Sequence, residues 1–108
     1  MKEAERLADL FKALANPLRL RILALCAARE RTSTELRRLL GVSKPLLIAH
    51  LKKLLKHGLL EYRVVVDEKR LVIRKLYRVP DDLEIRLDKE TLRRLAETLE
   101  GKERARSA

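Results

Sequence analysis

The residues of this 108-residue chain best suited to chemistry are cations gathered in one stretch. Residues 43–79 hold ten Lys and Arg side chains against three acidic ones, a net charge of +7, whereas residues 80–100 have a net charge of −3. A concentrated set of cations is suited to binding the phosphates of a polyanion such as a nucleic acid. The alternative is a charged surface that binds only solvent.

No catalytic or metal-binding pattern accompanies these cations. The chain lacks a G-x-S-x-G sequence, a phosphate-cradling glycine loop and an H-E-x-x-H pair. His50 and His57 are seven residues apart, with no carboxylate or thiol at ligand spacing. The single Cys26 lies on an apolar stripe, where a thiol is usually inert packing rather than a redox or metal sensor. We therefore expect no enzyme, no cofactor and no metal site.

The size and composition predict one small globular domain. The mass is 12.6 kDa and 46% of the residues are hydrophobic. One cysteine excludes an intrachain disulfide, and no stretch approaches the roughly 20 apolar residues of a membrane span or the apolar core of a signal peptide. We expect a cytoplasmic protein. The absence of glutamine and the 39% of charged residues are typical of hyperthermophile proteins.

The apolar periodicity predicts a mainly helical fold with the element order α-α-α-α-β-β-α. The predicted helix N-caps are Asn16, Thr32, Ser43 and Asp88, and the predicted helix ends are Gly41, Gly58 and Gly101. A short helix over 32–40, a glycine turn and a longer helix over 43–57 form a helix-turn-helix pattern. Residues 60–79 alternate around a polar turn and predict a β-hairpin, which makes the motif winged.

The ends of the chain complete the predicted organisation. A short third strand over Leu83–Leu87 and a last helix over 88–100 follow the hairpin, and the polar residues 101–108 predict a flexible basic tail. The domain therefore spans residues 1–100, with terminal helices over 1–15 and 88–100.

Three segments of the chain resemble the ArsR/SmtB winged-helix repressors. They are Leu10–Leu23 at the family's opening, Val42–Leu60 around its recognition helix, and Lys75–Val79 at the end of its wing. The resemblance implies a homodimeric cytoplasmic regulator that binds operator DNA and releases it on sensing an effector. The family's metal ligands are missing, as in archaeal-type members without metal motifs, because Thr32–Leu40 has no Cys and Glu90 stands where a His is needed.

The motif predicts that helix 43–57 enters the major groove of duplex DNA while the wing 60–79 follows the backbone. The expected DNA-binding residues are Thr34, Arg37, Arg38, Ser43, Lys44, Leu46, Ala49, His50, Lys53, Arg63, Lys69 and Arg70. The cations would position the protein on phosphates. Leu46 and Ala49 can meet thymine methyls but make no bidentate hydrogen bonds, so base discrimination is modest or depends on DNA shape.

Two of these residues have competing interpretations. His50 occupies the family's habitual histidine position, where it either contacts the DNA backbone or packs beneath the helix. Leu46 either faces the groove or is an ordinary core residue.

Two half-sites about one helical turn apart require a twofold dimer. The leucine-rich stripes of the terminal helices are the predicted interface, as in the family. The residues are Leu7, Leu10, Phe11, Leu14, Leu92, Leu95 and Leu99. The alternative is that these stripes close the core of the monomer itself.

These observations together predict a sequence-preferring, double-stranded DNA-binding transcriptional regulator, a repressor by resemblance, with an unknown effector. One alternative is an architectural, chromatin-type DNA-binding protein with little sequence specificity. Another is a winged helix used for protein–protein contact, with Leu46 and Ile48 as an exposed apolar patch.

Overall fold

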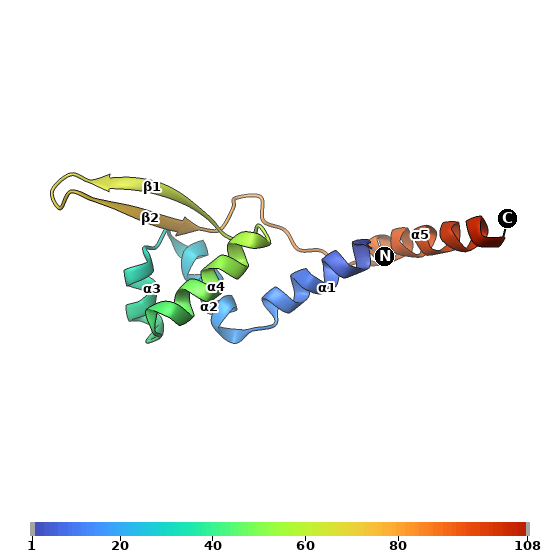
Figure 1. Cartoon of the computed structure of the whole chain (residues 1–108), viewed down its shortest axis with the longest axis horizontal. Coiled ribbons are helices and arrows are strands. Elements are labelled where there is room, and N and C mark those ends of the chain that lie inside the picture. Colours follow the sequence, from blue (N-terminus) through green and yellow to red (C-terminus); the bar gives the residue numbers. More distant parts are fainter. Residues whose placement is uncertain (1, 108) are drawn as a thin grey trace. The chain divides into compact units, whose positions relative to one another are not determined.

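The computed structural model describes residues 2–107, with side chains described through Gly101. The elements are α1 (Lys2–Leu14), α2 (Pro17–Ala28), α3 (Ser33–Leu40), α4 (Lys44–Lys56), β1 (Glu61–Asp67), β2 (Val72–Arg78) and α5 (Lys89–Ser107) (Figure 1). This order confirms the predicted mainly helical, winged helix-turn-helix fold. Asp9–Leu83 forms one compact unit, here called the winged unit, and the terminal segments form another.

The predicted N-caps begin the helices as expected, because each side-chain oxygen accepts a backbone N–H that the first helical turn leaves without a partner. Asn16 Oδ1 accepts from Leu18 N at 2.9 Å, and Thr32 Oγ1 accepts from Glu35 N at 3.2 Å. Asp88 does the same for α5.

The cap of α5 also has an electrostatic consequence. Asp88 Oδ1 accepts from both the backbone N–H and the hydroxyl of Thr91, each at 2.8 Å. These two hydrogen bonds, the backbone one first, hold the pKa of the Asp88 carboxyl below its usual range.

Two of the three predicted glycine stops are correct, and one is wrong. Gly41 ends α3 with φ of 65°, and Gly58 follows α4 with φ of 68°, a left-handed conformation that favours glycine. At Gly101 the helix continues to Ser107, so the predicted helix end at this glycine is wrong. A glycine can remain in a helix interior at a cost of about 1 kcal/mol. Ala108 lies outside the described residues.

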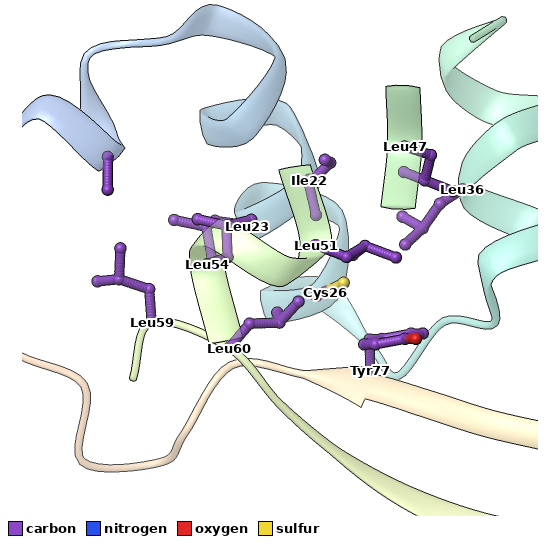
Figure 2. Packing of buried hydrophobic residues seen from close by; sticks show 11 residues of the cluster. Ile22, Leu23, Cys26, Leu36, Leu47, Leu51, Leu54, Leu59, Leu60 and Tyr77 are labelled. Atoms are coloured by element: carbon purple, nitrogen blue, oxygen red, sulfur yellow. The ribbon is translucent and has the colours of Figure 1, made fainter. Parts of the chain in front are cut away.

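The hydrophobic core of the winged unit joins its helices to the base of the hairpin. Figure 2 shows Leu36 of α3 and Leu47 of α4 pointing toward each other, which fixes the helix-turn-helix pair. Its buried members are Ala13, Ile22, Leu23, Cys26, Leu36, Leu47, Leu51, Leu54, Leu59, Leu60 and Tyr77. Burial of this many large apolar side chains in one cluster stabilises the unit, since each contributes roughly 1.5–3 kcal/mol.

The two strands pair antiparallel, with Tyr62 opposite Tyr77 and Val66 opposite Ile73. On its other edge β2 is bridged by Arg31, whose N–H and C=O bond to the backbone of Tyr77 at 3.0 and 2.8 Å. This bridge fastens the base of the hairpin to the loop before α3. The far end of the hairpin projects beyond α3 and α4 (Figure 1).

The predicted third strand over 83–87 is wrong, because those residues are not in a strand. Leu83 instead closes a turn by donating its N–H to the Pro80 carbonyl at 3.1 Å and packs on the core. Alternation alone does not make a strand, because the backbone must also pair with a neighbouring strand, and the sheet that the structure describes contains only β1 and β2. Among the described residues, no helix is both long and apolar enough to cross a membrane.

Candidate nucleic-acid interface

Helix α4 has an apolar inner face and a cationic outer face. Leu47, Leu51 and Leu54 are buried in the core. The exposed residues of the helix are Lys44, Pro45, Leu46, Ala49, Lys52, Lys53 and Lys56. Because residues three and four apart share a helix face, Ala49, Lys53 and Lys56 form one outward stripe. The structure therefore leaves the predicted contacts Lys44, Ala49 and Lys53 accessible to a ligand.

The two apolar positions of α4 differ in their accessibility. Leu46 has 45% of its surface exposed, which excludes the interpretation that it is an ordinary core residue. Ile48 is only half-buried. Ser43 is exposed at the N-cap, and its Oγ accepts from Leu46 N at 3.4 Å. The N-terminal turn of α4 thus presents one hydroxyl and one leucine to solvent.

Helix α3 presents its predicted residues outward as well. Thr34, Arg37 and Arg38 are exposed, while Leu36 on the opposite side is fully buried. Neither arginine makes an ion pair with another described residue. Both guanidinium groups are therefore free to meet a polyanion.

His50 is held by an arginine that the sequence interpretation did not single out. Arg19 Nε donates to His50 Nδ1 at 3.0 Å, and the Arg19 NH1 nitrogen donates to the carbonyls of Lys12 and Ala13 at 3.4 and 3.2 Å. Burial first, and the charge of Arg19 second, lower the pKa of His50 below 6.5. Arg19 thus ties the end of α1 to α4, and the contact favours the interpretation that His50 packs beneath its helix.

The cations of the hairpin divide into a paired set and an unpaired set. Near the base, Arg63 Nε pairs with Glu30 at 2.8 Å, and Arg78 pairs with Glu61 at 3.3 Å and Asp81 at 3.0 Å. Arg63, predicted to bind DNA, is therefore engaged with an acid of its own chain. The ion pairs of Arg63 and Arg78 with Glu30 connect the hairpin base to the segment before α3.

The tip of the wing has the opposite character. Lys69 and Arg70 are exposed and make no ion pair with any described side chain. Their backbone N–H groups donate to Asp67 Oδ1 at 3.1 and 3.2 Å, which fixes the turn without using their side chains. Between the strands, Lys75 Nζ lies 4.6 Å from the ring centre of Tyr62, a cation–π contact. The side chains of Lys69 and Arg70 are thus available to bind an anionic ligand.

The predicted dimer residues fall into two groups. In the winged unit, Leu10 and Leu14 pack against the core of their own chain, which favours the alternative of core closure for these two, and Phe11 is half-buried. In the terminal segments, Leu7 and Leu95 are half-buried, while Leu92 and Leu99 are 53% and 52% exposed. Of the predicted interface residues, Leu92 and Leu99 of α5 are therefore the ones that the described chain leaves most exposed.

Cys26 is a buried free thiol. Burial, opposed by the charge of Arg31, raises its pKa to about 11, so the reactive thiolate is scarce at neutral pH. The neighbouring Tyr77 also has a raised pKa, chiefly because it is buried. Among the residues the structure describes, no group of three His, Cys, Asp or Glu side chains is arranged to hold a metal ion.

Sequence reasoning missed three residues that shape this surface: Arg19, Glu30 and Leu71. The first two act through tertiary contacts with residues about 30 positions away, for which the sequence carries no local signal. Leu71 is 87% exposed and has φ of 54°, a conformation rare for a leucine. Its place beside a predicted polar turn was the only available hint.

The α3–α4 helix pair followed by the β1–β2 hairpin is the architecture of winged helix-turn-helix proteins. In this chain the helix pair and the hairpin both carry exposed cations. Residues 14–63 match a family model described as a helix-turn-helix domain. No curated protein matches the chain significantly.

Solved structures give the closer comparison. NolR from Sinorhizobium fredii is 32% identical, with a TM-score of 0.64 and coverage of 75% of each chain. Mb0332 from Mycobacterium bovis, a homodimeric winged helix-turn-helix DNA-binding domain described as a possible ArsR-family transcriptional regulator, is also 32% identical, with a TM-score of 0.60 and coverage of 72% of this chain and 67% of its own. The transcriptional repressor BigR from Xylella fastidiosa is 29% identical, with a TM-score of 0.59 and coverage of 74% and 73%. The chain belongs to the ArsR-like winged helix-turn-helix transcriptional regulators.

Proposed function

We propose that this chain is a homodimeric regulator that prefers particular sequences of double-stranded DNA and represses transcription by occupying them. Helix α4 lies in the major groove and the wing follows the adjacent backbone, as in other winged helix-turn-helix proteins. The repressor role is supported by the similarity to BigR, which is a transcriptional repressor. The site of action is the cytoplasm, and the protein catalyses no reaction.

The observation that carries this proposal is the distribution of unpaired cations. Arg37, Arg38, Lys44, Lys53, Lys69 and Arg70 are exposed on the elements that this class of protein presents to DNA, and no described acid neutralises them. Arg63 and Arg78, by contrast, are held by acids near the hairpin base. Phosphate binding requires cations free to replace condensed counterions, so the first set is proposed to contact phosphates and Arg63 is not.

The dimer is supported by a relative and by the surface of α5. Mb0332, which shares this fold, is homodimeric. Leu92 and Leu99 leave about half of their surface exposed, which a second copy would cover. We propose that α5, with Leu7 and Leu95, forms most of the interface.

The proposal is tested by selecting bound duplexes from a random library with the full chain, then comparing selected and random duplexes at increasing salt. A regulator keeps its preference for the selected duplex as salt rises, because base contacts do not depend on counterion release. An architectural protein loses both duplexes together. A protein-contact module binds neither, and that result would overturn the proposal.

A matched pair of charge reversals locates the site. Lys53→Glu, on the outward stripe of α4, is expected to weaken binding of every duplex by about tenfold or more, since it removes one phosphate contact and adds a repulsion in each protomer. Arg21→Glu makes the same change of charge at an exposed residue of α2, outside α3, α4, the wing and the proposed dimer interface. It should alter binding by less than about twofold at moderate salt. Equal losses in the two variants would mean that only net charge matters.

A further inference from the structure

The tip of the wing combines cations with an apolar group that the fold does not need. Leu71 is 87% exposed and adopts φ of 54°. A non-glycine residue with positive φ is strained by about 1 kcal/mol, and asparagine or glycine occupies the position at less cost. Neither packing nor backbone geometry therefore explains a leucine here, which points to a role outside the folded unit.

The apolar character continues along one face of the hairpin. Val66 and Ile73 are opposite each other in the register, so their side chains share a face, and they are 65% and 73% exposed. The same face is covered only at its base, where Tyr77 is 8% exposed. The outer half of the wing thus ends in apolar groups that the folded unit leaves open to solvent.

The charges beside this group identify the kind of partner. Lys69 and Arg70 precede Leu71 directly, and both lack an ion pair within the described part of the chain. Leu71 thus follows two unpaired cations, with the exposed acid Glu68 before them. An apolar tip with this pair of cations suits neither a neutral protein surface nor a second wing, whose own cations would repel it. It does suit the minor groove of DNA, where phosphates line both sides and apolar side chains can insert between base steps.

We propose that the wing tip is an apolar wedge: Leu71 enters the minor groove beside the major-groove site, partly unstacks a base step and bends the duplex, while Lys69 and Arg70 hold the flanking phosphates. Known minor-groove proteins insert Leu, Ile, Phe, Met or Pro in this way and kink DNA by about 20–90°. The bend also supplies sequence preference without base-edge hydrogen bonds, since flexible steps deform at lower cost. This matches a recognition helix whose exposed N-terminal half carries Leu46 and Ala49.

The test rests on the proposed function and uses the full chain with a duplex selected from a random library. Fluorescent labels at the two duplex ends report bending by energy transfer, and 2-aminopurine placed under the wing reports unstacking. Wild type is expected to shorten the end-to-end distance and to raise the 2-aminopurine signal. Leu71→Asn should abolish both changes, although it suits the backbone conformation at least as well and should not lower thermal stability.

Two further variants exclude simpler explanations. Leu71→Met keeps a flexible apolar group and should retain the bend. Leu20→Asn removes a leucine that is 51% exposed on α2, outside α3, α4 and the wing, and should leave the bend unchanged. The affinity loss in Leu71→Asn is expected to be about tenfold or less, because the apolar contact that it removes is largely offset by the unstacking cost that it avoids.

The outcomes separate this proposal from the proposed function. If Leu71→Asn binds and bends DNA as wild type does, the wedge is wrong while the DNA-binding function stands. If Leu71→Asn changes the sedimentation of the free protein and not the bend, the tip is a self-association surface and the wedge is again wrong. If no duplex is bound by wild type at all, the proposed function fails first.

Discussion

The winged unit and the last helix use leucine in opposite ways. Every side chain of the buried cluster belongs to Asp9–Leu83, and within it Leu36, Leu47 and Leu54 are completely buried. In α5, by contrast, Leu92 and Leu99 keep about half of their surface exposed, and no described side chain of the helix is buried. The first pattern is that of a unit whose core is complete within one chain. The second is the pattern expected of a surface that a partner covers. We therefore propose DNA binding for the winged unit and dimerisation for α5.

The largest expected effect concerns the core of the winged unit. Leu54→Ala should lower the free energy of unfolding by about 2–5 kcal/mol, because it leaves a cavity where a fully buried side chain packed. Urea denaturation followed by circular dichroism measures this loss. A change below about 0.5 kcal/mol would mean that the cluster is not the stabilising core.

A second substitution tests the other half of the comparison. Leu92→Ala with Leu99→Ala should raise the dissociation constant of the dimer about tenfold or more. The reason is that each protomer loses two half-exposed leucine side chains that the partner would bury. Sedimentation equilibrium measures the dissociation constant. Leu39→Ala, at a leucine 50% exposed on α3, is the matched control and should leave it unchanged. An unaltered dimer in the α5 variant would place the interface elsewhere.

A third prediction concerns the Arg19–His50 contact inside the winged unit. The pKa of His50 is lower in the folded chain than in the unfolded chain, so the unfolded chain binds a proton at His50 more readily. Protonation of His50 therefore favours unfolding. The stabilising contribution is therefore complete above pH 6.5 and is lost as the pH falls below that value. His50→Gln should flatten this part of the pH dependence, which thermal melts between pH 4.5 and 8 would show. An unchanged profile in the variant would assign the effect to other groups.

The smallest expected effect is at Cys26. With a pKa raised to about 11 and a buried thiol, it should react with a thiol reagent at pH 8 far more slowly in the native protein than in urea. The rate of absorbance change with an aromatic disulfide measures this. Fast stoichiometric reaction of native protein would reopen a redox role for this cysteine.

Local signals allowed most of the fold to be predicted, because caps and periodicity act within a few residues. Asn16, Thr32 and Ser43 begin their helices as expected, and Gly41 ends one. The predicted helix end at Gly101 is wrong because a glycine favours a helix end without enforcing it. Pairing between distant segments was beyond prediction, as the Arg31–Tyr77 bridge shows.

The candidate site was predictable in its residue types and less so in its available charges. Exposure of Lys44, Ala49 and Lys53 follows from helical periodicity alone. The pairing of Arg63 with Glu30 depends on how the hairpin meets the loop before α3, so a count of cations overstated what is free. The left-handed backbone of Leu71 arises from the geometry of the turn, which no residue preference indicates.

The most direct test of the account is the salt dependence of DNA affinity for wild type and for Lys69→Glu/Arg70→Glu. If Arg37, Arg38, Lys44, Lys53, Lys69 and Arg70 of two protomers each neutralise one phosphate, log K should fall against log salt with a slope of about −11. The double variant should bind every duplex more weakly by a similar factor, with a slope of about −7 or shallower. Equal slopes and equal affinities in the two proteins would contradict the claim that this cationic surface binds the phosphates of duplex DNA.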